Sequence, residues 1–158
     1  MPVPQSSAAR KNWMMAINED NGAGLRKSIN ITLPTIQTAS GNLDIYLMAP
    51  EDGILHSAEL SALDGLAASD TNYLTFSMTN LGQSGTGTTE MLAATAENTT
   101  KVTGGAALTA NSRRILKTAT TPSALNVNAG DRIRFRSTGT GTLSNTVSGA
   151  VLLFRFNP

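Results

Sequence analysis

The sequence contains no cysteine, few aromatic residues and few charged residues. Without cysteine, neither a disulfide nor a thiolate metal site can hold the fold together. Aromatic residues make up 4% of the chain and charged residues 15%, whereas an average soluble domain is about 25% charged. A surface with so little charge repels its neighbours weakly, so it suits a protein that other chains cover.

The sequence also lacks long apolar runs, and its first residues do not read as a secretory signal. The longest apolar stretches, such as residues 149–154, are far shorter than the roughly 20 residues that a membrane helix needs. Residues 1–5 lack the basic start and apolar core that a signal peptide requires. We therefore expect no membrane association, and synthesis in a cytoplasm.

Threonine and glycine are abundant instead, with 21 and 14 copies. Threonine favours pleated, half-exposed surfaces, and glycine supplies turns. A length of 158 residues suits one domain, which at this size can bury roughly 70% of the surface of its unfolded chain. The composition therefore favours a single β-rich domain with a real core.

From residue 28 onward, apolar residues recur mostly at every second position. Such alternation places one set of side chains in a core and the other set on the opposite face of a sheet. The clearest strand candidates are 28–33, 43–48, 73–79, 132–136 and 151–156, and the weaker ones are 53–60, 86–93, 113–118 and 124–127. Because turn residues separate most of these segments, the pattern predicts an all-β sandwich or barrel. The Ala-rich stretch 90–97 could form a helical turn instead.

The first 27 residues differ from the rest, and we predict an N-terminal arm at 1–27 followed by a β-sandwich domain at 28–158. Trp13, Met14 and Met15 form an apolar cluster, and the Asn/Gly-rich residues 21–24 are typical of a linker. Burying each large apolar side chain is worth roughly 1.5–3 kcal/mol, so something should cover this cluster. Either the arm folds back onto its own core, or it docks on a partner and these three residues are assembly contacts.

Charge is divided unevenly along the chain. Residues 28–100 contain eight acidic residues and no Lys or Arg, whereas residues 101–158 contain eight basic residues and one acidic residue. This division can be neutralised within one subunit or between neighbouring subunits.

Arg132, Arg134 and Arg136 are the most specific charged feature. Their spacing puts all three guanidinium groups on one face of a strand, roughly 7 Å from one to the next. Arginine suits bidentate contacts with carboxylates or phosphates. The face could be solvated, could contact the acidic middle segment of another subunit, or could bind a glycan, a phosphate or nucleic acid. Direct nucleic-acid binding is disfavoured, because the net charge is only +1 and aromatic residues are few.

Catalytic and metal-binding patterns are weak. The single histidine, His56, lies near Asp52 and Ser57. In an extended strand, however, His56 and Ser57 point to opposite faces, which disfavours a catalytic triad. One histidine cannot anchor the usual zinc sets, and no loop has the alternating acidic spacing of a calcium site. We therefore predict no catalytic residue, no metal and no cofactor, and we expect that the protein is not an enzyme.

Several segments occur in a familiar order: strand, Pro/Gly turn and strand at 45–55, then strands at 73–80, 125–133 and 150–156. This order resembles that of small jelly-roll proteins of tailed-phage virions, notably capsid decoration (cement) proteins and the related knobs of fibres. The resemblance spans about residues 42–157.

The resemblance implies a jelly-roll-like antiparallel β-sandwich that forms a homotrimer. It also implies a place on the outer capsid surface of the virion, where such a protein binds the major capsid protein and stabilises the shell. It carries over no catalytic residues. The alternative is a receptor-binding knob of a tail or head fibre, which would recognise a glycan or a surface protein.

Overall fold

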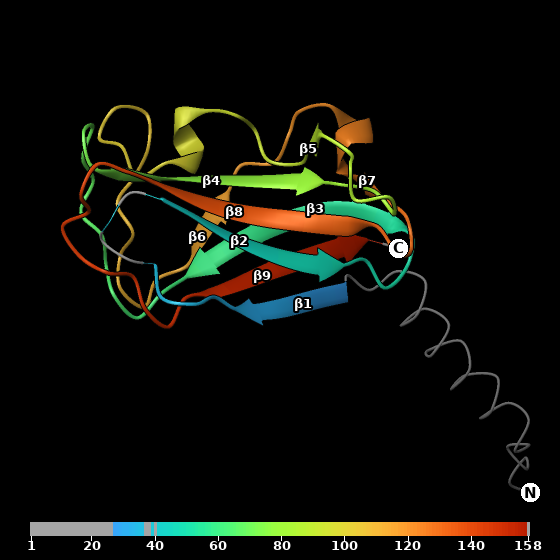
Figure 1. Cartoon of the computed structure of the whole chain (residues 1–158), viewed down its shortest axis with the longest axis horizontal. Coiled ribbons are helices and arrows are strands. Elements are labelled where there is room, and N and C mark those ends of the chain that lie inside the picture. Colours follow the sequence, from blue (N-terminus) through green and yellow to red (C-terminus); the bar gives the residue numbers. More distant parts are fainter. Residues whose placement is uncertain (1–26, 37–38, 40, 158) are drawn as a thin grey trace, which may run out of the picture.

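The computed structural model describes residues 27–36, 39 and 41–157. It confirms the predicted all-β class, because these residues form two antiparallel sheets that pack face to face as a sandwich (Figure 1). The first strand begins at Lys27, one residue before the predicted domain boundary. Trp13, Met14 and Met15 lie outside the described residues, so the arm at 1–27 stays a prediction.

One sheet has the strand order β1-β9-β3-β6, with β7 also paired to β3. Its strands are β1 (Lys27–Thr32), β9 (Val151–Asn157), β3 (Gly53–Ser61), β6 (Arg114–Leu116) and β7 (Asn126–Val127). The other sheet has the order β2-β8-β4-β5. Its strands are β2 (Gly41–Met48), β8 (Arg132–Thr140), β4 (Tyr73–Asn80) and β5 (Thr89–Glu90). Two 3₁₀ helices lie in the connections, η1 (Ala96–Asn98) and η2 (Pro122–Leu125).

The strand pairing is nested: strands near the two ends of the chain pair with each other, and strands nearer the middle pair inside them. Strand β1 pairs with β9, β2 with β8, β3 with β6, and β4 with β5. Successive pairs alternate between the two sheets. A double sheet built in this way is a jelly roll, so the fold that the resemblance implied is confirmed.

The alternating pattern placed the core side chains correctly. In β9, β4 and β8, every second side chain is buried between the sheets: Leu152, Phe154, Phe156, Leu74, Phe76, Met78, Ile133 and Phe135. The rings of Phe76 and Phe135, on neighbouring strands, stack with centroids 6.1 Å apart. Contacts of this kind between neighbouring strands stabilise a sheet face.

The weaker strand predictions hold unevenly. The segment 53–60 is a full strand, β3, but only two or three residues of each of the segments 86–93, 113–118 and 124–127 pair as β5, β6 and β7. The Ala-rich stretch does form one helical turn, η1, near its predicted end. The surrounding connections are held by backbone hydrogen bonds between loops and by side-chain hydrogen bonds to the backbone, and alternation predicts neither.

A tight turn before β8 fixes the position of Arg132, the first of the three alternating arginines (the arginine stripe: Arg132, Arg134 and Arg136). Gly130 has a φ of 84°, a left-handed conformation that glycine adopts without strain. The buried Asp131 carboxylate accepts hydrogen bonds of 2.9 Å from the Asn128 N–H and from Asn80 Nδ2 at the end of β4. The turn therefore ties the start of β8 to its neighbouring strand.

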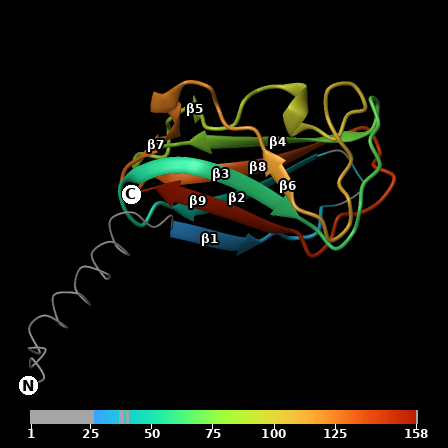
Figure 2. The same cartoon turned by 180° about the vertical axis from the view of Figure 1, so that it is seen from behind.

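Burial is incomplete along one side of the sandwich. Strands β1 and β2 end their respective sheets and lie along the same side of the molecule in both views (Figures 1 and 2). Five of their side chains pack against the core but stay partly exposed: Ile29, Ile31, Leu43, Ile45 and Leu47. We call this strip the β1–β2 seam.

Candidate assembly surface

The outer face of the β2-β8-β4-β5 sheet carries the arginine stripe. Ile133 and Phe135 point into the core, so the three arginines that alternate with them point outward. Because β8 lies between β2 and β4, the outward side chains of those two strands flank the stripe. They are Asp44, Tyr46 and Met48 on β2, and Thr75, Ser77 and Thr79 on β4. We call this surface the arginine face.

Arg136 is neutralised within the chain. Its Nε and a terminal nitrogen each donate a 2.6 Å hydrogen bond to the Asp44 carboxylate, 92 residues away in sequence. This bidentate geometry is the strong form of an arginine–carboxylate contact. The hydrogen bonds from Arg136 lower the pKa of Asp44, and nearby positive charge adds to them against the opposing effect of burial. The same hydrogen bonds raise the pKa of Arg136.

We expect Asp44→Asn to reduce the free energy of unfolding by about 1 kcal/mol at pH 7, the upper end for a partly exposed pair. Because folding lowers the pKa of Asp44, the pair stabilises the protein above the unfolded-state value of about 3.9. The contribution disappears as pH falls through the lower folded-state value. Urea denaturation of both proteins from pH 7 to pH 2 tests this, and a difference that persists at pH 2 would contradict it.

Arg134 occupies the centre of the arginine face, opposite Tyr46 on one side and Thr79 on the other. A terminal nitrogen donates a 3.1 Å hydrogen bond to Thr79 Oγ1, and that hydroxyl donates a 2.8 Å bond to Glu90 Oε1. Within the described part of the chain, the buried Arg134 Nε has no hydrogen-bond partner. Buried donors are normally satisfied, so this nitrogen is an exception at the centre of the face.

Apolar side chains are exposed directly beside the unneutralised arginines. Met48 is 66% exposed opposite Arg132, and Tyr46 is 54% exposed opposite Arg134. Among the residues that the structure describes, neither Arg132 nor Arg134 has a carboxylate within ion-pair distance. Arginine, tyrosine and methionine are the residue types that protein–protein interfaces favour. The arginine face therefore has the composition of a protein-binding surface.

Three further ion pairs form within the subunit among the described residues. Glu59, only 5% exposed on the outer face of the other sheet, is 3.5 Å from Arg113 and 3.3 Å from Arg155. Glu97 pairs with Lys117. Each pair joins the acidic middle segment to the basic C-terminal segment, so part of the charge division is neutralised inside one chain.

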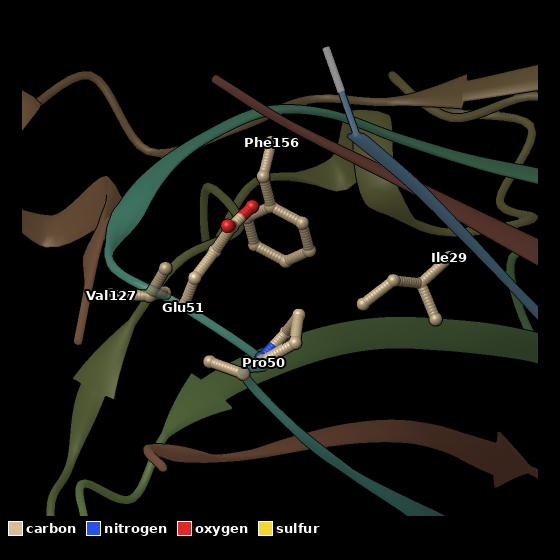
Figure 3. A pocket seen from close by; sticks show the side chains of 6 residues that line it. Ile29, Pro50, Glu51, Val127 and Phe156 are labelled. Atoms are coloured by element: carbon tan, nitrogen blue, oxygen red, sulfur yellow. The ribbon is translucent and has the colours of Figure 1, made fainter. Parts of the chain in front are cut away.

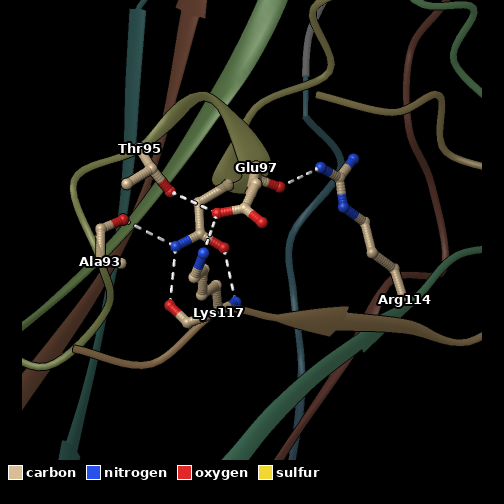
Figure 4. Close-up of polar contacts among 6 residues, drawn as sticks. Ala93, Thr95, Glu97, Arg114 and Lys117 are labelled. Carbon is tan, nitrogen blue, oxygen red and sulfur yellow. Dashed lines mark hydrogen bonds and ion pairs between the residues drawn. The ribbon is translucent and has the colours of Figure 1, made fainter. Parts of the chain in front are cut away.

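Asn98 organises the loops beside β6, and no motif in the sequence signals it. Its Nδ2 donates 2.8 Å hydrogen bonds to the carbonyls of Ala93 and Lys117, and its Oδ1 accepts a 2.7 Å bond from the Lys117 N–H (Figure 4). Arg114 closes the same region by donating to the carbonyls of Ala106, Glu97 and Thr99. Burial lowers the pKa of Arg114. Both side chains are used to hold loop backbone in place, so we assign them a structural role and not a role in binding.

The residues weighed for catalysis are not brought together. Ser57 donates to Glu59, and the Asp52 carboxylate accepts from the Ala129 N–H. A register shift in β3 makes His56 an extra, exposed residue without an opposite number on β9. Across the described ranges, no group of three or more His, Asp or Glu side chains is arranged to hold a metal ion. No helix in those ranges is both long and apolar enough to cross a membrane.

By topology the protein is a jelly roll, and one of its two sheets carries the arginine face on its outer side. No protein-family model and no curated protein matches the chain. Among solved structures it is similar to those of infectious bursal disease virus: the Gx strain (16% identity, TM-score 0.33), the Gt strain (10%, 0.35) and the VP2 subviral particle (14%, 0.33).

Each of these similarities covers 85% of this chain and 32%, 30% and 31% of the three viral chains, so this chain spans about a third of their length.

Proposed function

We propose that the protein is a non-enzymatic structural protein of a virion. In this proposal it forms a homotrimer, binds the major capsid protein on the outer capsid surface and stabilises the shell as a decoration protein. The observation that carries the proposal is the arginine face, where two arginines without a carboxylate partner in the described chain lie beside exposed Tyr46 and Met48. The jelly-roll topology and the low charge content support it.

The mechanism is adhesion through buried apolar area and oriented charge. Covering Tyr46 and Met48 with a neighbouring chain removes apolar surface from water, at about 25 cal/mol per Å². Carboxylates of that neighbour would pair with Arg132 and Arg134 and fix its orientation. A trimer presents three such surfaces, and simultaneous contacts raise its avidity for a shell without any new type of contact.

We expect the full-length protein to be a trimer at micromolar concentration, as measured by light scattering coupled to size exclusion. Cryo-electron microscopy of the source particle should then show its density on the outside of the shell. A monomer in solution would contradict trimer formation, and density on a fibre would contradict the decoration role.

Recognition of a glycan is the second candidate, and one groove favours it. Beside β4, this groove has a volume of about 390 Å³, and hydroxyl side chains line it together with the charged groups of Glu90 and Lys101. The one aromatic residue in its lining, Phe76, is 2% exposed and offers no face on which a sugar ring could stack. We therefore rank this function below assembly.

A further inference from the structure

The β1–β2 seam runs beside the strand with which the described chain begins. β1 starts at Lys27, which lies opposite Phe156 in the sheet. Phe156 and Ile29 line a mainly apolar hollow at that end of the seam, together with Pro50 and Val127 (Figure 3). The chain upstream of Lys27 is therefore tethered at one end of the strip of half-buried side chains.

The free edge of β1 is a template for one more strand. β1 is bonded on one side to β9 and has no partner strand on its other side among the described residues. Its six residues extend over about 20 Å. Residues 18–26 can span about 30 Å when extended, so the cluster at 13–17 can return along the whole of β1.

The sequence before β1 is complementary to β1 in one particular register. Gly22-Ala23-Gly24 has the composition of a three-residue hairpin loop. With that loop, Ile17 would lie opposite Ile29, Met15 opposite Ile31, and Trp13 opposite Leu33, which is itself buried.

The same register also matches charges. It would place Glu19 opposite Lys27 and Asp20 opposite Arg26. Apolar pairs and opposite-charge pairs across two antiparallel strands are both stabilising. A shift by one residue would destroy the apolar matches, because it would turn the arm's apolar side chains to the other face.

We infer that residues 13–20 of the same chain form a β-hairpin with β1 and close the β1–β2 seam. Trp13, Met15 and Ile17 then lie on the inner face and cover the exposed parts of Leu43, Ile45 and Leu47. The same chain is the favoured source, because a short tether gives the arm an effective concentration in the millimolar range. The inference concerns the arm and does not depend on the proposed role of the arginine face.

A cysteine cross-link in the full-length protein tests the register, since the natural chain contains no cysteine. Position 16 lies opposite position 30 in the proposed hairpin, on its outer face. Oxidised Ala16→Cys/Asn30→Cys is expected to form a disulfide within one chain, seen as a faster monomer band on a non-reducing gel. The matched control, Ala16→Cys/Ser28→Cys, is two residues out of register and should cross-link at least tenfold more slowly.

Two other outcomes of the cross-linking would overturn the inference. Equal rates for the two cysteine pairs would contradict the proposed pairing of residue 16 with residue 30. A disulfide between two chains would show that a second copy supplies the strand.

The fluorescence of Trp13, the only tryptophan, gives an independent reading. In the intact protein its emission should be blue-shifted and protected from acrylamide. Glu19→Lys should lose that shift, and Glu19→Lys/Lys27→Glu should regain it, because the swap restores opposite charges across the hairpin. An exposed Trp13 in the natural protein would overturn the inference.

Discussion

Replacing Arg134 with glutamate is expected to weaken assembly at least 100-fold while the sandwich stays folded. Arg134 lies at the centre of the arginine face, between Tyr46 and Thr79, and no carboxylate of the described residues is within ion-pair distance of it. Arginines at the centre of interfaces commonly contribute 2 kcal/mol or more, and a hundredfold loss corresponds to about 2.8 kcal/mol. A glutamate would also place a like charge near Glu90, which Arg134 reaches through Thr79.

Sedimentation velocity over a concentration series measures this effect on self-association, and co-sedimentation with purified shells measures it on shell binding. Arg134→Lys keeps the charge but loses the planar fork, so its loss should be intermediate. Thr120→Glu, at an exposed site outside the strands, controls for added negative charge and should leave assembly unchanged. If Arg134→Glu assembles like the natural protein in both assays, the arginine face is only a solvated surface.

Substituting Asn98 with alanine is expected to lower the free energy of unfolding by about 1–3 kcal/mol. Asn98 is 1% exposed, and without its amide the Lys117 N–H and the Ala93 carbonyl lose their hydrogen bonds to it. A buried polar group left unsatisfied costs about 1–3 kcal/mol. The two carbonyls are less affected than the N–H, because the Lys117 carbonyl also accepts a bond from the Ala93 N–H and the Ala93 carbonyl also accepts one from the Thr95 N–H.

Urea denaturation followed by circular dichroism measures the loss. Asn98→Asp is the matched variant of equal size: it keeps an acceptor for the Lys117 N–H but turns an oxygen toward two carbonyls, so it should also be strongly destabilised. Thr95→Ala, which removes a hydroxyl that bonds to the exposed Glu97 carboxylate, should change stability little. A mild effect of both Asn98 variants would mean that packing, and not the amide hydrogen bonds, holds these loops.

The sequence predicted the long strands well and the short ones poorly. Alternation in segments such as 132–136 and 151–156 follows from the two-residue repeat of extended backbone, which each segment carries in its own residues. The pairing of β5, β6 and β7 is limited to two or three residues. Its extent depends on anchors such as Asn98, which bonds to Lys117, 19 residues away.

The sequence predicted which arginines share a face, but it did not predict which side chains surround them. The spacing of Arg132, Arg134 and Arg136 alone predicts that they share a face. It could not predict that only Arg136 is neutralised, because its partner Asp44 is brought next to it by the pairing of β2 with β8. The exposed Tyr46 and Met48 beside the other two arginines have the same origin.

By itself, the sequence determined the extended conformation, the side chains that face the core, and the outward stripe of arginines, because steric alternation acts between neighbouring residues. The tertiary structure alone decided the nested order of strands, the charges that are cancelled within the subunit, and the side of the sandwich that stays open. These depend on contacts between segments far apart in the chain, where many pairings satisfy the same local pattern and only the packed whole selects one.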